Sequence, residues 1–301
     1  MTALSPTSAT SSTRTASTDV MREFDSIIFD VDGTLWDSTG TLAKAYSAAS
    51  AEFCDCFGLR KRTFTKEQIM GELGQPTIEI FHHLYPELEG FCPDLFLKTF
   101  RRALKGEAPF THMLSEQMQK RKEPLSFAGV AGIGCSEETG SAGSIATPAF
   151  TAEDIETVYE FMVWRSMEYE YDFLRKYGAD VYPAVAETLR ALKEKYRLFI
   201  VSNCEKGYIE LFTGFSETAE LFEGWLSYGD TGVEKDQTIR IIMEHYGLQT
   251  PVYVGDILKD ALSSKRAGVG FIWASYGFGE VPEDLRDAKI GSFEKLSEIL
   301  L

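Results

Sequence analysis

The chain has 301 residues, a length that suggests one or two domains. Hydrophobic residues make up 44% and charged residues 25%, which is ordinary for a globular protein and excludes a chain that is disordered throughout or a coiled coil. The net charge of −16 repels phosphate backbones and anionic membranes, so we expect neither nucleic acid nor a membrane as a partner. The 5 cysteines are an odd, scattered set, which favours a reducing compartment and a cytoplasmic protein.

Two segments lack the pattern of a packed core. The first, residues 2–19, consists mostly of Ser and Thr and has no apolar stretch of the kind that a secretory signal needs. We therefore expect residues 1–20 to form a disordered tail. The second, residues 124–150, is rich in Gly, Ala and Ser and shows no sustained periodicity. It is longer than loops in compact domains usually are, so we expect a flexible insertion there.

The first predicted element is a strand at residues 26–31, a short apolar run typical of a buried strand. Apolar residues then recur at spacings of three and four from 41 to 122, which predicts helices throughout that part. Thr65 stands where the N-cap of one of these helices belongs. A long amphipathic helix is predicted at 151–177.

After residue 180, strands alternate with helices. The predicted strands are 197–202, 225–228, 251–255 and 270–274. This alternation is typical of an α/β fold with a Rossmann-like parallel sheet, which the strand near residue 28 should join. The helical block between this first strand and the strands after residue 180 is then an insertion. We therefore expect a core domain of residues 21–40 and 181–301 and an inserted α-helical cap domain of residues 41–180.

Polar side chains follow the predicted strands, where open parallel sheets bind their ligands. They are Asp30, Asp32, Gly33, Ser202, Asn203, Asp256 and Asp260, together with Lys235 at the start of a helix. A single aspartate at a strand end is more often a turn former or a helix cap. The joint occurrence of these residues instead indicates an oxygen-ligand site for Mg²⁺ beside a cradle for phosphate.

The segment Phe29-Asp30-Val31-Asp32-Gly33-Thr34-Leu35 resembles the first motif of the haloacid dehalogenase-like superfamily. Ser202, Lys235 and the segment from Gly255 to Asp260 resemble its second, third and fourth motifs. The resemblance covers the whole expected core, and the helical block resembles the cap of phosphoglycolate-phosphatase-like members. It implies a Mg²⁺-dependent phosphatase that acts on a small phosphorylated metabolite.

The resemblance also implies roles for the residues. Asp30 would attack phosphorus to give an aspartyl-phosphate, and Asp32 would protonate the leaving oxygen and later deprotonate water. Mg²⁺ would be held by the Asp30 side chain, the Asp32 backbone carbonyl and Asp256. The phosphate would be bound by Ser202, Asn203, Lys235 and the backbone at Gly33. Asp260 would orient Lys235 or a metal-bound water.

Other activities stay open at this point. Dehalogenases of the superfamily lack an acid two residues after the nucleophile, so Asp32 favours phosphoryl transfer. A phosphosugar mutase would use a histidine shortly after the nucleophile, whereas the nearest one here is His82. A catalytically weak binding or regulatory module would be favoured by loss of a motif residue. Phosphoglycolate, sugar phosphates and nucleotides all remain candidate substrates, and the protein could be a monomer or a homodimer.

The position of the helical block predicts a lid over the site, with hinges near 38–40 and 178–182. Five basic residues of the block are candidates for binding a second anionic group of the substrate: Lys44, Lys61, Arg62, Arg101 and Arg102. Residues 275–279 are expected at the entrance from the core side.

Overall fold

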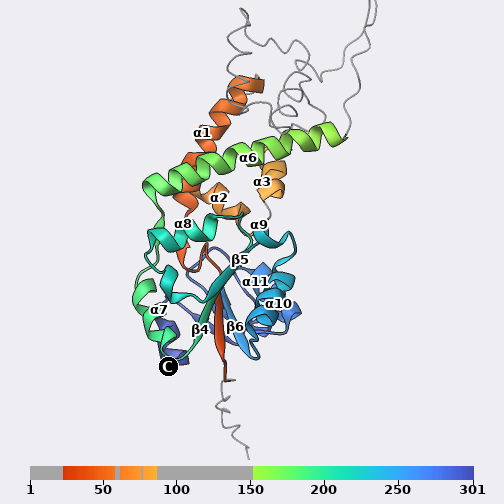
Figure 1. Ribbon diagram of the computed structural model, residues 1–301. Coiled ribbons are helices and arrows are strands. Elements are labelled where there is room, and N and C mark those ends of the chain that lie inside the picture. The colour runs from red at the N-terminus through yellow and green to blue at the C-terminus, as the bar shows by residue number, and fades with distance from the viewer. Residues whose placement is uncertain (1–22, 58–61, 76, 87–151) are drawn as a thin grey trace, which may run out of the picture.

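The computed structural model describes residues 23–57, 62–75, 77–86 and 152–301 (Figure 1). The expected tail at 1–20 and the expected insertion at 124–150 lie outside these ranges, as do Lys61, Arg101 and Arg102.

The centre of the molecule is a six-stranded sheet in which every neighbouring pair is parallel. Its spatial order is β5-β4-β1-β6-β7-β8. The strands are β1 (Ser26–Phe29), β4 (Arg197–Ser202), β5 (Gly224–Ser227), β6 (Pro251–Gly255), β7 (Gly270–Ala274) and β8 (Ala288–Ile290). The expected α/β fold with a parallel sheet is confirmed.

Both faces of the sheet are covered, which explains why its strands are apolar without alternation. Ile27 and Phe29 of β1 pack into one buried cluster, whereas Ile28 packs into a second cluster on the opposite face. The flanking helices are α7 (Val185–Lys193), α8 (Tyr208–Phe215), α9 (Tyr228–Thr231), α10 (Lys235–Tyr246), α11 (Leu258–Ala267) and α12 (Lys295–Leu300).

A second group of helices lies beyond the carboxyl ends of the strands (Figure 1). It contains α1 (Thr39–Phe57), α2 (Lys66–Glu72), α3 (Thr77–Leu84) and α6 (Ala152–Tyr177). α1 and α6 pack along each other and α3 packs against α6. The predicted N-cap is confirmed, because Thr65 accepts a hydrogen bond from the Gln68 N–H and Gln68 bonds back in a capping box. Helices therefore occupy the described part of the segment that was expected to form a cap.

The chain passes twice between the sheet and the second group of helices (α1, α2, α3 and α6, called the upper helices below), and the two connecting segments run side by side. Strand β2 (Trp36–Asp37) pairs antiparallel with β3 (Asp180–Val181), and the Thr41 hydroxyl donates to the Gly178 carbonyl at 2.8 Å. Gly178 has a φ of +65°, a conformation that glycine adopts without cost. The two segments expected to act as hinges, 38–40 and 178–182, therefore lie beside each other.

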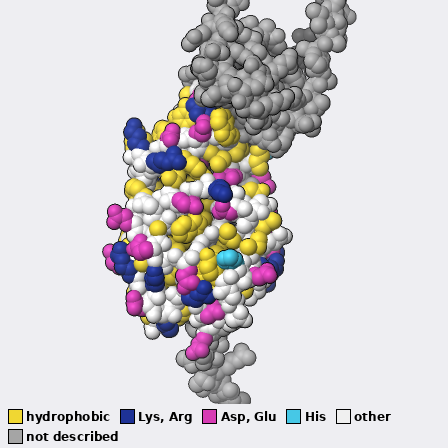
Figure 2. Space-filling view, in the orientation of Figure 1, with side chains coloured by type: hydrophobic (Ala, Val, Ile, Leu, Met, Phe, Trp, Pro, Cys, Tyr) yellow, Lys and Arg dark blue, Asp and Glu magenta, His cyan; other side chains and the backbone are white. Residues whose placement is uncertain are grey.

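Basic and acidic side chains are interspersed over the described face in Figure 2. No helix within the described ranges combines the length and apolar character needed to span a bilayer.

Candidate active site

Asp30 lies at the carboxyl end of the central strand β1. Its N–H continues the sheet ladder by donating to the Val254 carbonyl at 2.9 Å, which fixes the backbone from which the side chain projects. The side chain is 5% exposed and lines a pocket between the sheet and the upper helices. Burial raises the pKa of the Asp30 carboxyl, and the nearby Lys235 ammonium opposes that rise.

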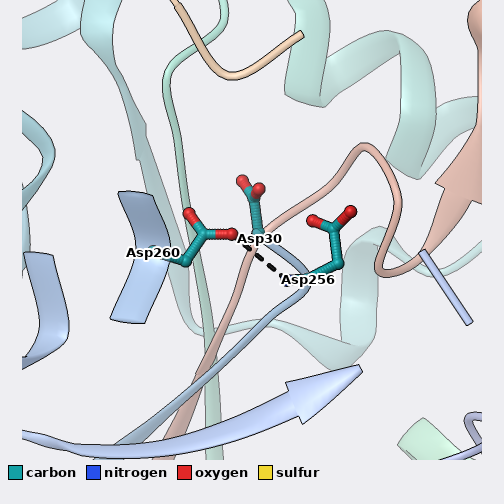
Figure 3. A group of neighbouring side chains, drawn as sticks. All are labelled: Asp30, Asp256 and Asp260. Atoms are coloured by element: carbon teal, nitrogen blue, oxygen red, sulfur yellow. Dashed lines mark hydrogen bonds between the residues drawn. The ribbon is translucent and has the colours of Figure 1, made fainter. Parts of the chain in front are cut away.

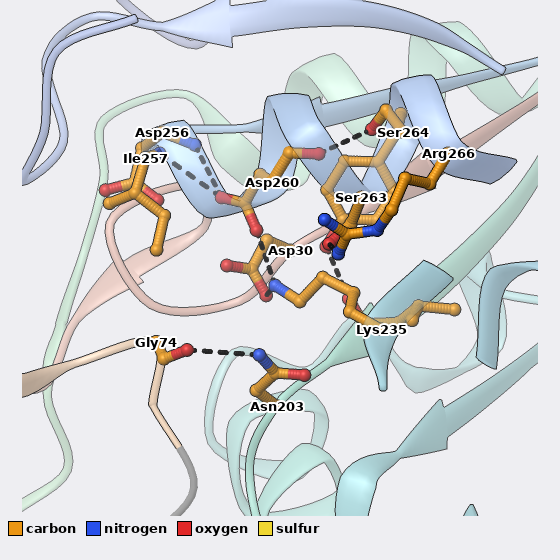
Figure 4. Close-up of polar contacts among 12 residues, drawn as sticks. Asp30, Gly74, Asn203, Lys235, Asp256, Ile257, Asp260, Ser263, Ser264 and Arg266 are labelled. Carbon is orange, nitrogen blue, oxygen red and sulfur yellow. Dashed lines mark hydrogen bonds and ion pairs between the residues drawn. The ribbon is translucent and has the colours of Figure 1, made fainter. Parts of the chain in front are cut away.

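Lys235 brings a buried positive charge to Asp30. The Lys235 Nζ lies 3.2 Å from Asp30 Oδ1 and 2.6 Å from Asp260 Oδ1, and the lysine is 1% exposed (Figure 4). The other Asp260 oxygen accepts the N–H groups of Asp256 and Ile257. Asp260 therefore joins the lysine to the loop that carries Asp256.

Three aspartates gather at the same edge of the sheet. Asp30, Asp256 and Asp260 each offer a carboxylate oxygen, and these oxygens lie within 4.8 Å of one another (Figure 3). All three side chains are buried. Hard carboxylate oxygens are the ligands that Mg²⁺ prefers, so this donor set fits such an ion.

Gly33 allows the chain after β1 to pass directly against Asp256. It has a φ of +76°, and a Cβ at this position would lie 2.0 Å from Asp256 Oδ2. Asp256 Oδ2 is held from the other side by the Phe278 N–H at 2.7 Å. Any side chain at residue 33 would therefore displace the Asp256 carboxylate.

We expect Gly33→Ala to lower kcat by about 100-fold or more, because small displacements of reacting groups carry costs of that size. The comparison variant is Gly214→Ala on α8, since a Cβ at Gly214 meets nothing within 4 Å. Steady-state kinetics and thermal unfolding of both variants would check this. An unchanged kcat in Gly33→Ala would show that catalysis does not need the close approach of the residue 33 backbone to Asp256.

Asp32 points its carboxylate at hydroxyl groups. The Ser38 hydroxyl and the Tyr208 hydroxyl both donate to Asp32 Oδ1, the second at 2.8 Å. Burial raises the pKa of Asp32 to about 7, although both hydrogen bonds act in the opposite direction. A carboxyl with a pKa near neutrality is suited to give and take a proton.

Ser202 and Asn203 end strand β4 next to Asp30. Both line the pocket, and Ser202 is 6% exposed. The Asn203 amide donates to the Gly74 carbonyl at 3.1 Å, so it contacts the segment after α2 (Figure 4). Of the side chains proposed from the motifs, all but Asp260 line this pocket, and Asp260 contacts it through Lys235.

The sequence analysis missed Tyr208, which hydrogen-bonds to Asp32, and four residues of the outer part of the pocket: Tyr46, Thr77, Glu170 and Glu205. One signal was available for Glu170. Met162, Ser166, Glu170 and Leu174 repeat every four residues along α6 and are all buried, so a carboxylate lies on the apolar face of the predicted helix. The Tyr46 hydroxyl donates to Glu170 Oε2 at 2.9 Å.

Glu170 should make stability depend on pH. Burial, followed by the negative charges of Asp32 and Glu205, raises its pKa to about 8, whereas an unfolded glutamate titrates near 4.5. The folded protein therefore holds a proton that the unfolded chain releases, and stability falls as pH rises between these values.

We expect Glu170→Gln to flatten the decrease in melting temperature between pH 5 and pH 8, since each unit of pKa corresponds to about 1.4 kcal/mol. Glu168→Gln, on the same helix but with a side chain 42% exposed, should keep the wild-type slope. Thermal unfolding at several pH values would measure both. Equal slopes of melting temperature against pH in the wild type and both variants would contradict a raised pKa at Glu170.

The basic candidates for a second anionic group are not at the pocket where they are described. Lys44 is exposed, and Arg62 donates to the Leu84 carbonyl and covers the Tyr85 ring. Among the described residues that line the pocket, Phe278 comes from the expected entrance loop and none is a histidine. His82 instead stacks on Tyr159.

A parallel sheet carries a buried lysine and converging aspartates at its carboxyl edge, beneath helices inserted after the first strand, which is the arrangement of a hydrolase site in an α/β fold. The chain belongs to the haloacid dehalogenase-like hydrolases, whose family model matches residues 24–268. The expected resemblance and the hydrolase class are thereby confirmed.

Relatives point toward phosphatases within this family. A phosphoglycolate phosphatase of Pseudomonas fluorescens is 27% identical over 151 residues. That match covers 43% of this chain and 55% of the relative, so the chain spans about half the length of that protein.

Two solved structures show the same fold. A predicted phosphoglycolate phosphatase from Haemophilus somnus has a TM-score of 0.59 at 19% identity, over 93% of this chain and 100% of that one. A haloacid dehalogenase-like protein from Streptococcus pneumoniae has a TM-score of 0.56 at 18% identity, over 92% and 99%. These similarities support the fold of the described residues.

Proposed function

We propose that the protein is a Mg²⁺-dependent phosphatase that hydrolyses a small phosphomonoester through an aspartyl-phosphate at Asp30. The observation that carries this proposal is the buried pair of Asp30 and Lys235, 3.2 Å apart, with Asp32 two residues further along. A carboxylate is already ionised when a neighbouring cation stabilises it, so it can act as a nucleophile. The family and the phosphatase relative support the same reaction class.

In the first half-reaction, an Asp30 oxygen forms a bond to phosphorus as the bond to the leaving oxygen breaks. Asp32 supplies the proton that the leaving alcohol needs. In the second half-reaction, Asp32 takes a proton from water, which attacks phosphorus and releases phosphate from Asp30. The hydroxyls of Ser38 and Tyr208 hold the Asp32 carboxylate during both steps.

The phosphate would be held by the groups that surround Asp30. Lys235 offers a cation, Ser202 a hydroxyl and Asn203 an amide. The expected contribution of Gly33 is limited, because its N–H already donates to the Trp36 carbonyl at 2.9 Å. Fixed donors around a phosphoryl group stabilise the charge that develops during transfer. Asp260 would act through Lys235, whose position it fixes at 2.6 Å.

A metal site is proposed at the same edge of the sheet. The residues that would hold Mg²⁺ are Asp30 and Asp256 through their carboxylates and Asp32 through its backbone carbonyl. When bound, the ion supplies positive charge that offsets the repulsion between the carboxylate nucleophile and the phosphate. The convergence of Asp30 and Asp256 supports this assignment.

The upper helices, within proposed cap boundaries of 41–180, would cover the substrate and exclude bulk water. The pocket lies between them and the sheet, which favours a small metabolite. We keep the cytoplasm as the proposed location and a monomer or homodimer as the proposed state.

The proposal is tested with a panel of phosphomonoesters, assayed for released phosphate with and without Mg²⁺. Hydrolysis of at least one small phosphate ester that depends on Mg²⁺ is expected. A folded protein that turns over none of them would instead indicate the binding or regulatory module.

A further inference from the structure

The outer part of the pocket, beyond Asp30 and Asp256, must accommodate the leaving group of the substrate. It is formed by Tyr46 of α1, Thr77 of α3 and Glu170 of α6, with Glu205 from the loop after β4. Glu205 follows β4 and Thr77 begins α3, so this part of the pocket lies where the sheet and the upper helices meet.

Glu205 brings a negative charge to this outer part, whereas the raised pKa of Glu170 keeps that carboxyl largely protonated near neutrality. Lys235 is the only basic residue among the described pocket residues. Lys235 is buried against Asp260 and Asp30 at the inner end. It is therefore committed to the transferring phosphate and cannot neutralise a second anion. A carboxylate or second phosphate on the leaving group would face the like charge of Glu205 in a partly dehydrated site, with no free cation among the described pocket residues to offset it.

The same groups are suited to hydrogen bonding with hydroxyls. The Tyr46 hydroxyl donates to Glu170 Oε2, and within the described residues Tyr46 is the only hydrogen-bond partner of Glu170. Glu170 is 7% exposed and faces the pocket, so its second oxygen is available to a ligand. Because the pKa of Glu170 is raised to about 8, this carboxyl can donate as well as accept near neutrality.

We propose that the leaving group of the substrate is an uncharged, hydroxyl-bearing alcohol, and that Glu170 and Tyr46 select it while Glu205 disfavours a second anion. This inference rests on the proposed phosphatase function and narrows its substrate class. It separates the protein from the phosphoglycolate phosphatase that it resembles, since phosphoglycolate carries a carboxylate.

The test uses two pairs of substrates in which a hydroxymethyl group replaces a carboxylate. They are glycerol 3-phosphate against 3-phosphoglycerate, and 2-hydroxyethyl phosphate against phosphoglycolate. We expect kcat/KM for the hydroxyl member of each pair to be about tenfold higher or more. The reason is that binding the carboxylate member brings two unpaired negative charges together in a buried site, which costs free energy. p-Nitrophenyl phosphate reports the proposed phosphatase function independently of this preference.

Two variants assign the preference to residues. Glu170→Met keeps a similar volume without hydrogen-bonding oxygens and should lower kcat/KM for glycerol 3-phosphate about tenfold more than kcat/KM for ethyl phosphate. Glu205→Gln should narrow the preference over 3-phosphoglycerate about threefold, because one negative charge is lost. Glu168→Met and Glu210→Gln are the matched controls, since neither glutamate lines the described pocket. Tyr46→Phe repeats the first test if Glu170→Met does not fold.

The outcomes are distinct. Hydrolysis of p-nitrophenyl phosphate with a preference for 3-phosphoglycerate or phosphoglycolate would overturn this inference and leave the phosphatase standing. An unchanged preference in the Glu170, Tyr46 and Glu205 variants would overturn the assignment to these residues. A tenfold preference for 2-aminoethyl phosphate over 2-hydroxyethyl phosphate would overturn the uncharged leaving group. No hydrolysis of any ester would overturn the proposed function, and this inference with it.

Discussion

Replacing Asp30 with asparagine is expected to reduce phosphatase activity by about 10⁴-fold or more while the protein stays folded, as removal of a covalent nucleophile does in other enzymes. Asparagine has nearly the shape of aspartate but cannot attack phosphorus. The backbone bond from residue 30 to the Val254 carbonyl does not depend on the side chain, so the sheet should be preserved. Steady-state kinetics and circular dichroism would measure both properties.

The control for this variant is Asp172→Asn. Asp172 lies on α6 with a side chain 77% exposed, and it pairs with Arg175 at the surface. It should keep wild-type kinetics. A folded Asp30→Asn protein with activity close to wild type would contradict the assignment of Asp30 as nucleophile.

Removal of divalent metal is expected to lower activity to about 1% or less, because the repulsion between Asp30 and the phosphate is then not offset. Activity should return with Mg²⁺ and should be inhibited by Ca²⁺, which takes more oxygen ligands at longer distances. Chelation with EDTA, gel filtration and re-addition of each ion would measure this.

An independent readout is thermal stability. Mg²⁺ should raise the melting temperature of the wild-type protein and raise it less in Asp256→Asn, because one proposed ligand is weakened. Asp284→Asn, outside the pocket, serves as the control. Full activity after exhaustive removal of metal would contradict the metal assignment.

Most of the fold could be predicted because its strands are buried on both faces. Continuous apolar runs such as 197–202 and 251–255 are long and clear, and the observed strands match them. β8 and the β2–β3 pair were missed. β8 (Ala288–Ile290) has only three residues, and β2 and β3 have two each, so no periodicity can develop within them.

The inner part of the candidate site could be predicted for a different reason. In a parallel sheet the carboxyl ends of neighbouring strands meet at one edge, so Asp30, Ser202 and Asp256 had to lie near one another. The outer part could not be predicted in this way. Tyr46 and Glu170 are 124 residues apart, and their contact depends on how α1 and α6 pack.

The measurement that tests the central claim most directly is chemical trapping of the covalent intermediate. The enzyme would be mixed with a turned-over phosphomonoester, quenched, and treated with borohydride, which reduces an aspartyl-phosphate to homoserine. Mass spectrometry of the tryptic peptide 23–44 resolves Asp25, Asp30, Asp32 and Asp37. Homoserine at residue 30 alone is the expected result. Conversion of a different aspartate, or rapid turnover with an unmodified peptide, would contradict nucleophilic catalysis by Asp30.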